Sequence, residues 1–242
     1  MAVESNDLGQ PVGWPVPDWQ PARHPRGAIM QGRLCRLEPI DRQLHAGDLF
    51  QAFSQDTSGA NWTYMPYGPF DDVTALEAWI DNTCLGDDPC FFSVIDLATN
   101  QAVGVASYLR IEPASGVIEV GHIHFSPLLQ GQTMATEVMY LMMQQVFDEL
   151  GYRRYEWKCD ALNAPSRRAA ERLGFLFEGV FRQATMYKGR NRDTAWFAII
   201  DREWPVIREA FEAWLDEDNF DDQGRQRGRL QDLMRDGLSA LR

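Results

Sequence analysis

The residues most able to do chemistry lie in one stretch, from Glu119 to Glu137. A strand is predicted to end near Phe125, and a short polar loop over residues 130–133 then leads into a long helix. The first amides of a helix have no intrahelical acceptor, and the helix dipole adds about half a positive charge at that end. This junction is therefore suited to bind an anion such as a pyrophosphate.

Three titratable side chains on the preceding strand could move a proton: Glu119, His122 and His124. If the strand is regular, the two histidines share one face and Glu119 lies on the other. A histidine has an ordinary pKa suited to a general base near neutral pH. Asp193, further along, is another candidate base. Two histidines from one strand do not make a zinc site, so we expect no metal.

Composition excludes several classes of protein. The 242 residues are 45% hydrophobic, which allows a sizeable core. The formal net charge of −12 argues against a nucleic-acid partner, which needs a basic face. Four cysteines form no CxxC pair and are expected to be buried thiols in a reducing compartment. No apolar run reaches 18 residues and no signal peptide is visible, so we expect no membrane association and a cytoplasmic location.

The elements before the Glu119–Glu137 stretch are predicted from prolines, caps and alternation. Residues 1–27 contain five prolines and read as an arm, which Trp14 and Trp19 are expected to dock onto the body. We expect a strand at 34–40, a helix capped by Asp41 and ending near Ser54, an aromatic loop at 61–70, and a helix from Asp71 or Asp72 to about 84. Three strands joined by short turns follow at 91–97, 101–111 and 117–125, hence antiparallel.

The elements after this stretch predict a mixed sheet. Apolar residues at helical spacing predict a helix over 134–150, followed by a strand at 154–159 and a helix over 163–174. A last hairpin pairs 175–188 with 194–200. A strand–helix–strand unit after an antiparallel meander implies a mixed sheet. Residues 203–220 and 224–242 read as helices, the second packing on its own body or on a partner subunit.

Two blocks of this sequence resemble the GNAT superfamily of N-acetyltransferases. Gln130-Gly-Gln-Thr133-Met-Ala135 is similar to the family's acyl-CoA pyrophosphate loop, with Thr133 where the family usually has Gly. Asn163-Ala-Pro-Ser166 together with Glu171-Arg-Leu-Gly174-Phe175 resembles the Rim-type branch, which acetylates ribosomal-protein N-termini. The likeness continues in Leu37-Glu-Pro39 and the aromatic loop, and it covers about residues 33–203.

The resemblance implies a fold and a domain organisation. The fold would be α/β (α+β): a mixed, mostly antiparallel sheet of six or seven strands, with one splayed parallel pair and helices on both sides. The parallel pair would be the strand that ends near Phe125 and the strand at 154–159. The expected domains are a Pro-rich arm at 1–27, the acetyltransferase domain at 28–203 and a helical extension at 204–242.

The resemblance also implies transfer of an acetyl group from acetyl-CoA to a primary amine, by direct attack and without a metal. The acceptor would be a small molecule or a peptide N-terminus. Backbone of the first splayed strand would pair with the pantetheine, and Asn163 would hold the pantetheine arm, although it could equally be a plain helix cap. The residues expected to contact the cofactor are Ile123, Phe125, Gln130, Gly131, Gln132, Thr133, Met134, Ala135, Thr136, Asn163 and Ser166.

Only some of the family's catalytic residues have counterparts in this chain. Many members have a Tyr that acts as general acid at the position of Ala170. The carboxylate that serves as base in the Rim-type branch corresponds to Thr185. Ser166 is then the candidate acid, Glu119, His122 and His124 the candidate bases, and a backbone amide near residues 123–125 would polarise the thioester.

The acceptor side and the assembly leave alternatives open. Trp62, Tyr64 and Tyr67 either pack or contact the amine by cation–π interaction. A GNAT-fold protein that binds acyl-CoA as a sensor or scaffold, without catalysis, is the alternative function. The C-terminal extension could make a homodimer.

Overall fold

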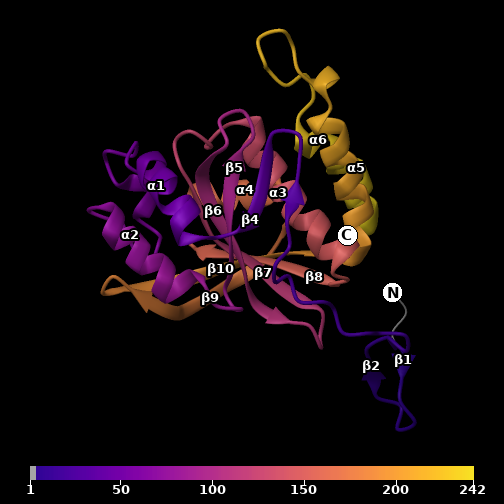
Figure 1. The fold of residues 1–242 in the computed structure, drawn as a ribbon. Coiled ribbons are helices and arrows are strands. Elements are labelled where there is room, and N and C mark those ends of the chain that lie inside the picture. Colours follow the sequence, from indigo (N-terminus) through magenta and orange to yellow (C-terminus); the bar gives the residue numbers. More distant parts are fainter. Residues whose placement is uncertain (1–3) are drawn as a thin grey trace.

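One mixed sheet organises the computed structural model, which describes residues 4–242. Its strand order is β3-β4-β5-β6-β7-β8-β10-β9, and every neighbouring pair is antiparallel except β7 and β8 (Figure 1). The strands are β3 (Met30–Gln31), β4 (Cys35–Pro39), β5 (Cys90–Asp96), β6 (Gln101–Glu112), β7 (Val117–Phe125), β8 (Arg154–Asp160), β9 (Leu176–Tyr187) and β10 (Arg190–Ile200).

The helices cover the sheet on both faces. Their bounds are α1 (Arg42–Phe53), α2 (Val73–Trp79) continued by a π-helical turn (Ile80–Cys84), α3 (Thr133–Gln144) continued by another (Gln145–Glu149), α4 (Ala164–Arg172), α5 (Trp204–Leu215) and α6 (Leu230–Leu241). Three-residue 3₁₀ turns lie at Ala60–Trp62, Asp201–Glu203 and Glu217–Asn219. Asp41 caps α1 and Asp72 caps α2 with side-chain oxygens, which confirms both predicted starts.

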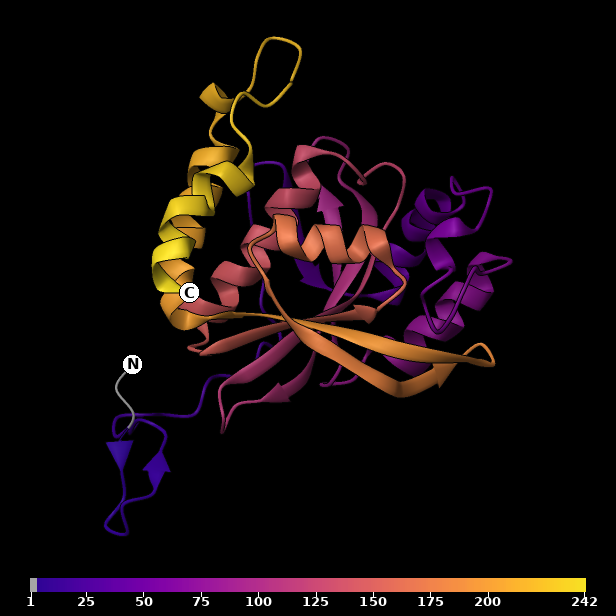
Figure 2. The ribbon, with the colours of Figure 1, turned by 180° about the vertical axis from the view of Figure 1, so that it is seen from behind.

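Two apolar clusters lie on opposite faces of the sheet. Leu49 of α1 and Leu76 of α2 pack on one face, against β5 and β6. On the other face α3, α4, α5 and α6 form the larger cluster, with Val138, Ile207 and Met234 among its members. Figures 1 and 2 show α1 and α2 on one side of the sheet and α5 and α6 on the other. The mixed sheet flanked by helices confirms the predicted fold class.

The structure adds elements that periodicity did not predict. Two-residue β3 makes an eighth strand where six or seven were expected. In the arm, β1 (Glu4–Ser5) and β2 (Pro11–Val12) form a small hairpin that stands away from the body (Figure 2). Trp19 docks the arm as expected, with its Nε1 donating to Ala114 O at 2.7 Å. Trp14 stays 53% exposed, so the expectation that it docks was wrong.

Three further expectations concern thiols, the tail and the membrane. All four cysteines are buried and free, as predicted. The last helix packs on its own body, because Leu230, Met234 and Leu238 join the larger cluster. Among residues 4–242, no helix is long and apolar enough to cross a bilayer.

Candidate acyl-transfer site

The parallel strands β7 and β8 pair over only part of their length and then diverge. The pairs run from Val117 with Arg154 to Val120 with Trp157. Beyond this point β7 continues to pair with β6, through Phe125, and β8 continues to pair with β10, through Asp160. Each strand therefore presents unpaired backbone to the other, as the expected splayed pair would.

A bulge in β7 brings all three candidate bases to one face. His122 has a φ of 49°, and the β6–β7 register shifts between the pairs Ser107–Gly121 and Val105–His124. The extra residue resets the alternation of side chains. The expectation that the histidines lie opposite Glu119 assumed a regular strand and was wrong: both histidine rings, like Glu119, lie on the face covered by α1 and α2.

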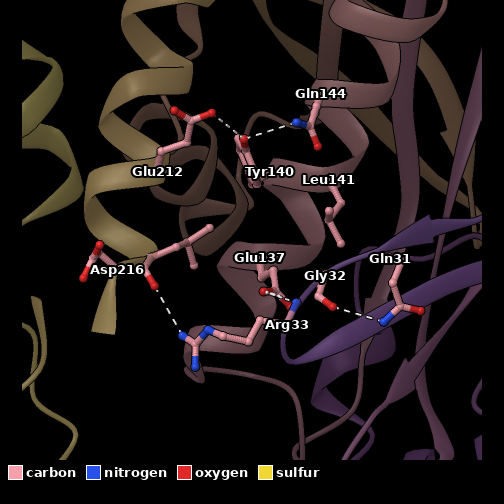
Figure 3. Close-up of a pocket in the computed structure, with 10 residues that line it drawn as sticks. Gln31, Gly32, Arg33, Glu137, Tyr140, Leu141, Gln144, Glu212 and Asp216 are labelled. Carbon is pink, nitrogen blue, oxygen red and sulfur yellow. Dashed lines mark hydrogen bonds between the residues drawn. The ribbon is translucent and has the colours of Figure 1, made fainter. Parts of the chain in front are cut away.

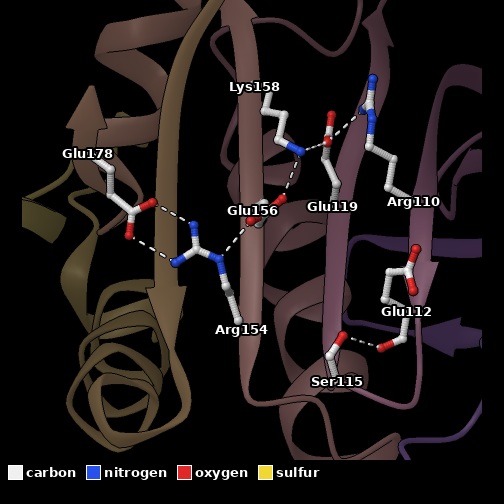
Figure 4. A network of polar contacts seen from close by, with 8 residues as sticks. All are labelled: Arg110, Glu112, Ser115, Glu119, Arg154, Glu156, Lys158 and Glu178. Atoms are coloured by element: carbon white, nitrogen blue, oxygen red, sulfur yellow. Dashed lines mark hydrogen bonds and ion pairs between the residues drawn. The ribbon is translucent and has the colours of Figure 1, made fainter. Parts of the chain in front are cut away.

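Glu119 is a buried carboxylate held between two cations. Its side chain is 4% exposed, and its Oε2 lies 2.6 Å from Arg110 Nη1 and 2.8 Å from Lys158 Nζ. Lys158 Nζ also pairs with Glu156 at 2.8 Å (Figure 4). It lies 3.7 Å from the centroid of the Trp196 ring. Burial raises the pKa of Glu119 above its ordinary value, while Lys158 and Arg110 oppose the rise.

Both histidines are neutral at pH 7. Burial lowers the pKa of His122, and equally that of His124, to about 4. His122 Nδ1 shares a hydrogen bond of 2.9 Å with Tyr67 Oη, which leaves Nε2 free of described partners. His124 is stacked on Trp62, with ring centroids 3.6 Å apart. A neutral imidazole can accept a proton, and His122 has the more available nitrogen.

The aromatic loop is largely built into the core. Trp62 is 3% exposed, and Tyr67 packs against Trp79 and His122. Tyr64 is half-buried, and its hydroxyl donates to Leu162 O at 3.2 Å. Of the three candidate acceptor contacts, Tyr64 therefore has the most accessible ring next to the end of β8.

The start of α3 offers amides to an anion. Gln132 occupies the N-cap position without a side-chain hydrogen bond, and the amides of Gly131, Thr133 and Met134 have no acceptor among residues 4–242. Gly131 has a φ of 72°, which favours glycine, whereas Thr133 does not require positive φ. The Thr at this position is therefore compatible with the loop's backbone.

The rest of this segment supports the loop. Gln130 Nε2 donates to Phe125 O at 2.8 Å and so closes the turn. Ala135 and Thr136 lie in the first turn of α3, where Thr136 Oγ1 accepts from Arg172 at 3.1 Å. Ile123 is half-buried against the larger cluster.

Asn163 and Ser166 open α4 beside the end of β8. Asn163 caps the helix, because its Oδ1 accepts from Ser166 N at 3.1 Å. Its side-chain nitrogen, Nδ2, has no partner among the described residues. Ser166 Oγ accepts from Trp157 Nε1 at 3.0 Å, and its hydroxyl also lies beside the Cys159 thiol, whose pKa it lowers against the effect of burial. Ala170, on the same helix, is fully buried.

Two other candidate positions lie on the last hairpin. Thr185 is exposed on β9. Asp193 Oδ1 accepts from Gln183 N at 2.8 Å, and this backbone hydrogen bond lowers the pKa of Asp193. Asp193 is thus committed to holding the hairpin.

Sequence reasoning missed two anchoring groups. Lys158 lies on β8 with only its spacing from Glu156 as a signal. Glu137 is buried in α3 and accepts three backbone hydrogen bonds from residues 33–35, at 2.8–2.9 Å. It borders a hollow of about 390 Å³ between α3, α5 and the β3–β4 turn, away from the splayed strands (Figure 3). Among residues 4–242, no group of three or more metal-binding side chains is present.

Comparison with known proteins identifies a family. Residues 34–176 match the acetyltransferase (GNAT) domain. A GCN5-related N-acetyltransferase from Brucella melitensis has a solved structure that is 47% identical, with a TM-score of 0.88, over 90% of this chain and 99% of that one.

Two curated relatives agree with this assignment. An uncharacterized N-acetyltransferase, p20, of Bacillus licheniformis is 28% identical over 58% of this chain and 80% of its own length. The ribosomal-protein-serine acetyltransferase of Escherichia coli K12 is 30% identical over 43% of this chain and 58% of its own length. The splayed strands, the open helix start and these matches agree, and the chain belongs to the GNAT family of acetyltransferases, with Rim-type enzymes among its relatives.

Proposed function

We propose that this enzyme transfers an acetyl group from acetyl-CoA to a primary amine, by direct attack in a ternary complex. The observation that carries the proposal is the pair of unpaired strand edges beyond Val120 and Trp157, next to an uncapped helix start. The strand edges offer hydrogen bonds to the amides of a pantetheine arm. The backbone amides of Gly131, Thr133 and Met134 suit a pyrophosphate. The free side-chain NH2 of Asn163, at the start of α4, would donate to the pantetheine arm.

The transfer requires one new bond, one broken bond and two proton movements. The amine nitrogen attacks the thioester carbon, the C–S bond breaks, the amine loses a proton to a base and the thiolate gains one. A backbone amide of residues 123–125 would polarise the carbonyl. Ser166, whose hydroxyl lies at the start of α4 between Trp157 and Cys159, is the candidate donor to the thiolate.

Glu119 and His122 are the two candidate bases that the pKa shifts and hydrogen bonds of the site support. Glu119 is a carboxylate with a raised pKa on the strand that carries the splay. His122 is neutral and has a free ring nitrogen. A water between base and amine would bridge the remaining distance, as general-base catalysis permits.

The second candidate function is an acyl-CoA-binding sensor or scaffold. It is favoured by one observation: Ala170, which stands where many family members carry an acidic tyrosine, is fully buried and offers no hydroxyl. A sensor would keep the coenzyme contacts and lose the turnover.

The test measures binding and turnover separately. We expect acetyl-CoA to raise the melting temperature, and Asn163→Ala to weaken acetyl-CoA affinity by about five- to tenfold, as loss of one or two hydrogen bonds would. Free thiol should appear when acetyl-CoA is mixed with a panel of amines. Binding without thiol release for any amine would favour the sensor, and an unchanged affinity in Asn163→Ala would remove this residue from the site.

A further inference from the structure

The hairpin of β9 and β10 carries a local concentration of positive charge. Between Gly179 and Arg192 there are four cations, Arg182, Lys188, Arg190 and Arg192, and no acidic residue, in a chain with a formal net charge of −12. Such a local reversal of sign creates a potential that a charged ligand senses over about 10 Å.

Within the described part of the chain, residues 4–242, these four cations form no ion pairs. The ion pairs formed among residues 4–242 all involve other basic side chains. Arg192 is only half-buried, yet its Nε is inaccessible to solvent and has no hydrogen-bond partner among the described residues. Its guanidinium lies against the ring of Tyr187, with Cζ 5.8 Å from the ring centroid, and its charge is not paired with an acid among the described residues.

The hairpin is attached to the mouth of the acyl-transfer site. Tyr187 Oη donates to Asp160 Oδ2, at the end of β8, at 2.9 Å, and Lys188 Nζ donates to Trp62 O at 2.7 Å. Figures 1 and 2 both show the hairpin tip beside α2. Arg167 Nη1 donates to Ala161 O at 3.3 Å, directly after β8, and Arg192 Cζ lies 5.8 Å from the centroid of the Tyr187 ring, so both guanidiniums lie near this end of β8.

We infer that this hairpin selects acceptor amines that also carry an anionic group, a carboxylate or a phosphate. The inference rests on the proposed transfer function and names the substrate class for it. An ammonium acceptor alone is repelled by Lys188, Arg190 and Arg192, whereas a nearby anion on the same molecule reverses the sign of the interaction.

The two neighbouring acids, Asp160 and Asp193, offset only part of the positive charge of the four cations. Asp160 accepts hydrogen bonds from Tyr187 Oη and Leu162 N, and Asp193 accepts from Gln183 N and Asn191 Nδ2. Both are engaged in holding the hairpin and the β8–α4 loop. The coenzyme phosphates have a separate proposed place at the start of α3. Lys188 is held by Trp62 O, so Arg190 and Arg192 are the cations offered to the acceptor.

The experiment compares acceptors that differ by one anionic group. Thiol release is measured for β-alanine against β-alaninamide, and for O-phosphoethanolamine against ethanolamine. The wild type is compared with the double variant Arg190→Gln/Arg192→Gln, so the intrinsic reactivity of each amine cancels in the ratio. Arg225→Gln is the matched control, because Arg225 is exposed in the loop before α6, away from the hairpin.

We expect the wild type to prefer the anionic member of at least one pair, and salt to reduce the preference. In the double variant kcat/KM for that member should fall about fivefold or more, with less than about a twofold change for the neutral member and for the control. The preferred pair distinguishes carboxylate from phosphate. Thiol release without preference, or a raised KM for acetyl-CoA instead, overturns the inference and leaves the proposed function standing. No thiol release with any amine overturns both.

Discussion

Glu119 is the residue whose surroundings constrain its chemistry most. It is buried on β7 between Arg110 from β6 and Lys158 from β8, and Glu156 shares the same Lys158. Arg154 links Glu156 to Glu178 on β9, so the row takes residues from β6, β7, β8 and β9 and passes over β10 (Figure 4). Because buried charges are costly unless paired, each member of this row controls the proton affinity of its neighbour.

This row makes a prediction about the pH dependence of transfer. If Glu119 is the base, it must be deprotonated, so activity rises with pH through the pKa of Glu119, which burial raises. Lys158→Met removes a cation that stabilises the carboxylate, so the acidic limb of kcat/KM should move to higher pH by about 1 pH unit or more. Glu156→Gln leaves Lys158 to Glu119 alone, so the limb should move to lower pH.

Opposite shifts distinguish this role from a structural one. A variant that merely loosens the strands would lower kcat at every pH without moving the limb. Lys158→Met leaves buried carboxylates without a partner and could unfold the protein. Glu156→Gln removes a charge and keeps the shape of the side chain, so this variant alone is sufficient for the test. An unmoved limb in Glu156→Gln would assign the base to another group, with His122 next.

At the scale of elements, the sequence predicted what depends on local pattern and missed what depends on partners. Asp41 and Asp72 start helices because their carboxylates cap nearby amides, a signal written in a few adjacent residues. The bulge at His122 is set by the pairing of β7 with β6, which alternation along one strand does not encode. The anchoring roles of Lys158 and Glu137 likewise appear only when distant segments meet.

Glu137 joins α3 to the β3–β4 turn and so supports the helix that offers amides to the coenzyme. Its carboxylate accepts from the backbone amides of Arg33, Leu34 and Cys35. An added Cβ at Gly32 would lie 2.6 Å from this carboxylate, which explains the glycine. Glu137, in the second turn of α3, thus holds the start of this helix against the β3–β4 turn.

Removing this carboxylate should destabilise the fold. Glu137→Ala leaves three backbone amides, one of them buried and two part-buried, without acceptors. We expect the free energy of unfolding to fall by about 3 kcal/mol in urea titrations. Glu212→Ala is the matched control, because Glu212 borders the same hollow but is exposed. We expect it to change stability by less than about 0.5 kcal/mol. Equal effects in the two variants would contradict the anchoring role.

At the scale of the whole molecule, the C-terminal extension braces the helix that carries Asn163. Arg242 pairs with Glu203 at 2.7 Å and its Nη2 donates to Gly174 O, at the end of α4, at 2.7 Å. The apolar face of α6 is used within the chain, so a homodimer through the extension would rely on the exposed Leu233 and Leu241. That assembly stays a prediction.

The two faces of α6 therefore predict separable effects. Leu238 is 7% exposed within the larger cluster, whereas Leu233 on the same helix is 44% exposed. Leu238→Ala should lower the free energy of unfolding by about 2–4 kcal/mol, and Leu233→Ala by less than about 1 kcal/mol, in matched urea titrations. If α6 braces α4, Leu238→Ala should also weaken acetyl-CoA binding at a temperature where the variant remains folded. If Leu233→Asp instead halves the mass measured by light scattering, the extension is an interface, and its outer face serves assembly while its inner face holds the site.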